Sequence, residues 1–236
     1  MNGTCRLCLG SHTLKQSHIF PEFLHRHASD EKFRTFELSV SRGKKRIRQT
    51  TEWEHLLCGA CERRLQEHET YFSRIWFEFP VLPAHPGPSI QLSGLDYRSF
   101  KLFHLSILWR AAVSERPAFK HVDLGPHAEK IRRALLAGDP GPATRYPVSG
   151  TVLLDDDGAI QHQVLVPYFQ SRVGGHHFWL GFYAGCEWSV TVSSHYHKDL
   201  AAANLTSDGR ILLICQPLVD LPHFKKLFGT FLRNEA

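Results

Sequence analysis

The sequence lacks the long apolar runs that a membrane-spanning helix requires. None of its segments is continuously apolar over the roughly 20 residues needed to cross a bilayer. The N-terminus also lacks the charged, apolar and cleavage regions of a secretory signal peptide. We therefore expect no membrane association. We expect a cytoplasmic protein, because a reducing compartment keeps paired cysteines free to bind metal.

Several sequence signatures of enzymes are also missing. The chain has no glycine-rich phosphate loop, no nucleophile elbow and no dinucleotide-binding fingerprint. It has no internal repeat and no low-complexity tract. A hydrophobic content of 42% and a charged content of 22% exclude global disorder, so a folded core is expected.

Two pairs of cysteines stand out in what the sequence does contain. Cys5 and Cys8 form one CxxC pair, and Cys58 and Cys61 form the second. Two such pairs supply the four thiolates that a tetrahedral structural zinc site requires. The metal would close a loop of 49 residues between Cys8 and Cys58. It would thereby replace the apolar core that so short a segment lacks.

A strongly basic segment lies inside this loop. From Lys32 to Arg48 the chain has seven basic residues and one acidic residue, Glu37. Loose alternation and a turn-like stretch at residues 41–44 predict a β-hairpin. The residues predicted to contact a nucleic-acid backbone are Arg42, Lys44, Lys45, Arg46 and Arg48. A solvated hairpin tip with no ligand is the alternative.

The segment Ser17-His18-Ile19-Phe20-Pro21 lies between the cysteine pairs, and Glu62 directly follows the last cysteine. This arrangement resembles the zinc-stapled bacterial and phage branch of the HNH endonucleases, which have the ββα-metal fold. The resemblance covers residues 5 to about 70. It implies that His18 is the general base and that Glu62 is a ligand of a catalytic Mg²⁺ or Mn²⁺. It also implies that nucleic acid, DNA in particular, is the substrate, in prokaryotic defence or a mobile element.

The sequence departs from the family pattern at Ser17, where the family usually has a metal-binding Asp. A serine hydroxyl is a poor ligand for a hard divalent cation, although it could hold a metal-bound water. Two alternatives therefore stay open. His18 could pack against the metal site as a structural residue. The module could also be an inactive nuclease that binds nucleic acid or a protein partner.

The sequence as a whole predicts the α+β class with two units. Residues 1–80 are expected to form the zinc-binding, HNH-like module, with a helix opening at the second cysteine pair. Residues 81–95 are rich in proline and are expected to form a connector. Residues 96–236 are expected to combine helices over 96–114 and 126–137 with an antiparallel sheet and a closing helix over 221–232.

The role of the C-terminal unit is less defined by its sequence. The run from Phe100 to Arg110 resembles a segment of uncharacterised bacterial proteins, and this resemblance implies no activity. The C-terminal unit could bind a protein partner. Its histidines are expected to be exposed residues at the ends of strands. The alternative is that they form a second metal site; they are His162, His176, His177, His195 and His197. Cys186 and Cys215 lie among apolar strand residues and are expected to be core residues.

Overall fold

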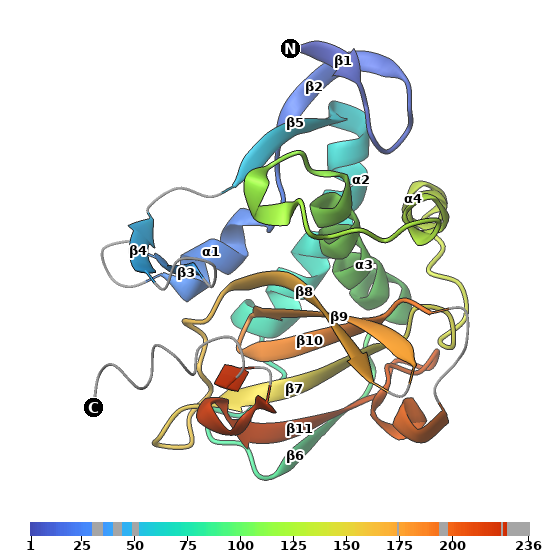
Figure 1. The fold of residues 1–236 in the computed structure, drawn as a ribbon. Helices are drawn as coiled ribbons and strands as arrows, with labels where there is room; N and C mark the ends of the chain where they lie inside the picture. The colour runs from blue at the N-terminus through green and yellow to red at the C-terminus, as the bar shows by residue number, and fades with distance from the viewer. Residues whose placement is uncertain are drawn as a thin grey trace.

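The computed structural model describes residues 1–29, 52–173, 175–193, 198–222 and 224–225. For Thr35–Ser39 and Lys44–Arg48 it describes the backbone alone. These parts combine α-helices with one mixed sheet and two antiparallel ones (Figure 1), which confirms the α+β class.

The N-terminal part is built on a three-stranded antiparallel sheet in the order β1-β2-β5. Its strands are β1 (Asn2–Thr4), β2 (Ser11–His18) and β5 (Trp53–Cys58). A short helix, α1 (Glu22–Ala28), follows β2. Helix α2 (Gly59–Ser73) begins directly after β5 and ends in a π-helical turn over Arg74–Glu78. The second cysteine pair therefore opens a helix, as predicted.

The basic segment forms the predicted hairpin. Strands β3 (Thr35–Ser39) and β4 (Lys44–Arg48) pair antiparallel, with Thr35 opposite Arg48 and Ser39 opposite Lys44. Arg42 lies outside the described residues. The hairpin lies on the same side of the molecule as α1 in Figure 1.

The C-terminal part contains a six-stranded sheet in the order β6-β11-β7-β10-β9-β8. Its strands are β6 (Ser89–Leu92), β7 (Val148–Leu154), β8 (Val166–Val173), β9 (His176–Tyr183), β10 (Cys186–Thr191) and β11 (Ile211–Pro217). The prediction of a purely antiparallel sheet is wrong at one pair, because β11 runs parallel to β7. The chain between β7 and β11, which includes β8, β9 and β10, is long enough for the connection that a parallel pair requires.

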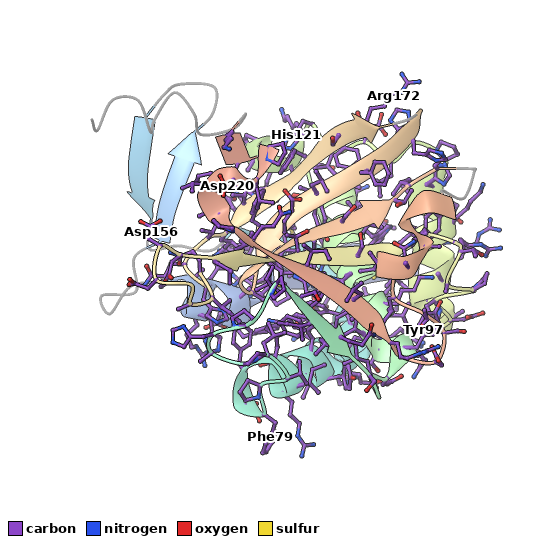
Figure 2. The ribbon with its side chains drawn as sticks, turned by 90° about the horizontal axis from the view of Figure 1, so that it is seen from below. Phe79, Tyr97, His121, Asp156, Arg172 and Asp220 are labelled. Carbon is purple, nitrogen blue, oxygen red and sulfur yellow. The ribbon has the colours of Figure 1, made fainter. Side chains whose placement is uncertain are left out.

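The segment predicted to be a connector contributes to this sheet. Within residues 81–95, the end strand β6 pairs antiparallel with β11, and Leu92 lies opposite Ile211. Upstream, the exposed Phe79 points away from the protein (Figure 2), with the Arg74 guanidinium 5.3 Å from its ring centre. The chain therefore returns to the fold soon after it leaves α2.

Helix α3 (Tyr97–Val113) agrees with the helix predicted over 96–114. It lies between the N-terminal part and the six-stranded sheet (Figure 1). Every residue from Ser99 to Ala111 is buried. Most of these residues are apolar, and the buried polar side chains Lys101, His104 and Arg110 have hydrogen-bond partners inside the protein, as burial of such groups requires. Helix α4 (His127–Ala137) ends at Gly138, whose φ of 66° gives the left-handed cap that glycine favours. None of the described helices is both long and apolar enough to cross a bilayer.

One hydrophobic core joins the two predicted units. It runs from Cys5 in the first loop to Cys215 in β11, and it includes both Cys186 and Cys215 as predicted. The rings of Phe72 in α2 and Phe103 in α3 stack with centres 4.0 Å apart. A smaller cluster with Leu153, Phe182, Leu221 and Phe224 covers the other face of the sheet. The predicted closing helix lies mostly outside the described residues.

Candidate metal centre and the adjacent His18 site

The four predicted ligand cysteines come together in the structure. The Sγ atoms of Cys5, Cys8, Cys58 and Cys61 all lie within 4.8 Å of one another. Cys8 lies in the loop between β1 and β2, and Cys58 ends β5. This cluster could therefore hold a metal ion and would fix the first loop to the start of α2.

Backbone hydrogen bonds fix the position of the first cysteine pair. Cys5 donates its N–H to the carbonyl of Gly10 at 2.9 Å, and Leu9 donates to the carbonyl of Cys5 at 2.8 Å. Leu9 itself has a φ of 64°, a left-handed conformation that closes the turn at some cost for a branched residue. The N–H of Cys58 donates to the Cys5 Sγ at 3.3 Å. These contacts hold the first thiol against the second pair.

The environment of the thiols favours a bound cation. Burial raises the pKa of Cys5, but hydrogen bonds from the backbone at Cys8, Cys58 and Leu7 outweigh it and lower that pKa to about 7. Burial and the neighbouring thiols raise the pKa of Cys61 far above its ordinary value. Four thiols this close cannot all ionise unless a positive charge lies among them. A metal ion would supply that charge.

A cavity of ≈ 350 Å³ borders the cluster. Cys8, Cys58 and Cys61 line it, together with Arg64 and Leu136. A metal ion at the four cysteines would therefore lie close to solvent and within reach of a small chelator.

The side chains of Ser17 and Glu62 bond to each other beside this cluster. Ser17, which is fully buried, donates its hydroxyl to Glu62 Oε1 and accepts the N–H of Leu57 at 3.2 Å. Burial raises the pKa of Glu62, while the Ser17 hydrogen bond and the charge of Arg110 partly offset that effect. The structure thus links the end of β2 to the first turn of α2 through a hydrogen bond.

His18 ends β2, and the residue is partly exposed. Its carbonyl accepts a hydrogen bond from Arg110 Nη1 at 2.8 Å, and Arg110 Nη2 forms an ion pair with Glu69 at 2.6 Å. Only 2% of the Arg110 side chain is exposed. The site of His18 therefore includes a cation from α3 and a second carboxylate from α2.

Arg110 was not identified as a site residue from the sequence, and Glu69 was considered only as a further carboxylate one to two turns beyond Glu62, with no assigned role. Glu62 and Glu69 are seven positions apart, which places them on one face of a helix, so this spacing was a usable signal. Arg110 was a second signal, because a permanent charge within an apolar helix requires a buried partner. The identity of that partner could not be read from spacing, since it comes from another element.

His25 in α1 is a further histidine near His18. Burial, and then the electrostatic effect of the neighbouring His18, lower the pKa of His25 to about 4. Its Nε2 is buried and has no hydrogen-bond partner among the described residues. His25 is therefore neutral at pH 7 and close to the predicted base.

The structure does not gather a second set of metal ligands. Among the described residues, the four cysteines are the one group of three or more His, Cys, Asp or Glu side chains close enough to share a metal. Glu62 therefore has no two such neighbours among the described residues, and its role as a ligand of Mg²⁺ or Mn²⁺ stays a prediction. The described C-terminal histidines do not form such a group either, and His195 and His197 lie outside the described residues.

For the predicted nucleic-acid-binding residues in β4, the structure describes the backbone alone. Lys44, Lys45, Arg46 and Arg48 all lie in β4, whose hairpin falls between α1 and β5 along the chain. Both flanking elements adjoin His18, since α1 begins four residues after it and β5 pairs with it at Trp53.

Comparisons of the chain with protein-family models, with curated proteins and with solved structures find no match. The geometry of the site is therefore the basis for its interpretation.

Proposed function

We propose that the protein is an HNH-like endonuclease that hydrolyses phosphodiester bonds in nucleic acid, with DNA as the expected substrate and a structural zinc at the four cysteines. One observation carries the proposal. The order β2, β5, α2 on a four-cysteine cluster ties the strand end that carries His18 to Glu62 in the first helical turn, because the adjacent Ser17 bonds to Glu62. This is the arrangement that the resemblance of the sequence implies.

The choice of zinc rests on the chemistry of the donors. Four thiolates select zinc or iron–sulfur chemistry over calcium or magnesium. Thiolates about 2.3 Å from a tetrahedral zinc stand about 3.8 Å apart, and the Cys8 and Cys58 sulfurs are 4.0 Å apart. With four protein ligands the ion has no open position, so its role would be structural.

His18 is the residue to which we assign chemistry. A neutral imidazole near solvent can take a proton from water as that water attacks phosphorus, because its ordinary pKa lies near neutral pH. The end of β2 is held on two sides, by the Arg110 hydrogen bond to the His18 carbonyl and by the Ile19 N–H bond to the carbonyl of Glu52 at 3.1 Å. A fixed backbone limits the positions that the ring can take. The cleavage assay described next tests whether the reaction needs the Mg²⁺ or Mn²⁺ that the resemblance implies.

The test is cleavage of plasmid, linear and single-stranded DNA, and of RNA, by purified protein with Mg²⁺, Mn²⁺ or EDTA. We expect cutting by the wild type and by His85→Ala, an exposed histidine remote from the site in sequence. We expect none by His18→Ala with unchanged zinc content. Cutting by a zinc-loaded His18→Ala protein would refute the role of His18, and a wild type that cuts no substrate would refute the nuclease.

A second function has specific support. Both hydrogen-bonding capacities of the Ser17 hydroxyl are used inside the protein, by Glu62 and by Leu57. In a non-catalytic module the same geometry would serve only to lock β2 to α2. Such a protein would bind nucleic acid or a protein partner without cutting. A setting in prokaryotic defence, in a mobile element or in the cytoplasm follows from the resemblance and composition alone.

A further inference from the structure

We propose that Arg110 is a positioning residue that fixes His18 against α2. The expected effect of Arg110 on catalysis rests on the proposed function, whereas its effect on the position of His18 does not. Arg110 belongs to α3, outside the part of the sequence that resembles the nucleases. The inference is therefore that the C-terminal part of the chain completes the candidate site.

The first step is the position of the guanidinium group. The Arg110 side chain is almost fully buried, and its Nε lies 3.4 Å from the carbonyl of Ser106 in its own helix. Its two terminal nitrogens point to different elements, one to the His18 carbonyl in β2 and the other to Glu69 in α2. One planar cation thus joins α3, β2 and α2 through directed hydrogen bonds.

The second step is the charge balance around it. Glu69 is 19% exposed and Glu62 is partly buried, so two carboxylates of α2 lie near the end of β2. Arg110 forms an ion pair with Glu69 at 2.6 Å. It therefore places a positive charge where these two carboxylates of α2 approach the end of β2.

The third step is what this cation does for His18. Because Arg110 binds the carbonyl and not the ring, it leaves the imidazole free while it fixes the peptide group that carries it. The neighbouring residues Ile19 and Phe20 are buried, so the chain cannot shift easily on that side. A displacement of about 1 Å at a catalytic group can cost roughly 10²-fold in rate, so removal of this bond should act on catalysis without removing a reacting atom.

The experiment compares three variants of the full-length chain. Arg110→Met alone would leave Glu69 buried without a partner and could fail to fold, so the informative variant is Arg110→Met with Glu69→Gln, which removes both charges. Arg110→Lys keeps the charge but cannot direct two hydrogen bonds in the fork geometry of arginine. Arg98→Met is the control, because Arg98 also lies in α3 and donates to a carbonyl, that of Gly138, at 2.6 Å.

The first readout is independent of activity. We expect the double variant to keep its zinc content and cooperative unfolding, while the NMR signals of the His18 imidazole and carbonyl shift. The Arg110→Lys protein should show an intermediate shift, and Arg98→Met should match the wild type. Unchanged His18 signals in the folded double variant would overturn the proposal, whether or not the protein cuts nucleic acid.

The second readout applies to cleavage. We expect kcat of the double variant to fall by about 10²-fold with KM unchanged, since a shifted base slows the chemical step and leaves substrate binding intact. A fall in DNA affinity with unchanged kcat would instead place Arg110 in substrate binding and overturn the positioning role. If the wild type cuts no substrate, the proposed function fails and the NMR result alone decides the role of Arg110.

Discussion

His25 shows how a single side chain can couple the candidate site to pH. Its pKa is lowered to about 4, first by burial and then by His18, so its ring is neutral at pH 7, and in the part of the chain that the structure describes its buried Nε2 has no hydrogen-bond partner. In the unfolded chain the same ring has an ordinary pKa of about 6.5. Between these two values the unfolded state therefore binds a proton that the folded state does not bind.

The expected result is a loss of stability on acidification. As pH falls below about 6.5, proton uptake by unfolded His25 lowers the free energy of unfolding, by about 2 kcal/mol at pH 5. His25→Gln removes this group, so urea titrations between pH 7 and pH 5 should show a flatter pH dependence. His85→Gln, an exposed control, should retain the wild-type slope. Equal slopes for His25→Gln and the wild type would show that His25 is not buried in this way.

Ser17 shows why residue roles were harder to predict than residue positions. The sequence shows that a serine replaces the family's aspartate, but it does not show that this hydroxyl bonds Glu62 and Leu57 at once. Those partners are 45 and 40 residues away along the chain. These hydrogen bonds depend on β2 lying beside β5, which the local sequence does not determine.

At the scale of elements, the four-cysteine cluster is the link between the β1–β2 loop and the start of α2. We expect Cys58→Ser to lose the metal and to disorder the N-terminal sheet, since the free energy of structural zinc binding is largely folding free energy. Cys215→Ala is the matched control, because Cys215 is also buried but lies in β11, outside the cluster. Metal analysis should give one zinc per chain for the wild type and control, and none for Cys58→Ser.

Circular dichroism melts of the same proteins complete this test. The melting temperature of Cys58→Ser should fall well below that of Cys215→Ala. A Cys58→Ser protein that unfolds like the control without bound metal would contradict the structural role of the cluster. A wild type with more than one tightly bound zinc would revive the alternative of a metal site at the histidines.

The β3–β4 hairpin concentrates positive charge on one element. Replacing Lys44, Lys45 and Arg46 by alanine should weaken DNA binding and reduce the slope of log K against log salt, by about 0.9 for each phosphate that is no longer neutralised. The control replaces Lys130 and Arg133 of α4, an exposed pair on the other side of the molecule (Figure 1). Fluorescence anisotropy over a range of salt concentrations measures both. Equal salt slopes for the triple variant and the wild type would exclude the hairpin from binding.

Elements were predicted well where local sequence determines them. The ranges of α3 and α4 and the opening of α2 follow from apolar periodicity and from caps such as Gly138. The parallel pairing of β11 with β7 and the role of β6 were missed, because each depends on which strand the chain meets after a long connection. The cluster of cysteines was predictable from spacing, whereas Arg110 and Glu69 were not assigned to the site.

At the scale of the whole molecule, the two predicted units share their interior. Phe72 of α2 stacks on Phe103 of α3, and the Trp76 indole donates to the carbonyl of Ala184 at 2.8 Å. Polar interactions reinforce this shared surface, since Ser114 donates to Glu54 at 2.7 Å and the Arg132 side chain donates to the carbonyl of Leu7. The N-terminal part therefore relies on the C-terminal part for burial of its apolar face.

This arrangement predicts that residues 1–80 do not form a native module by themselves, even with zinc. Such a fragment would expose Phe72, Trp76 and Phe20, and each buried aromatic contributes several kcal/mol to stability, about 3–5 when truncated to alanine. We expect the zinc-loaded fragment to bind a hydrophobic dye and to unfold without cooperativity, whereas the full-length protein does neither. A fragment whose amide NMR spectrum overlays that of the intact protein would show that the module is autonomous, and the contribution of α3 to the His18 site would then be dispensable for its fold.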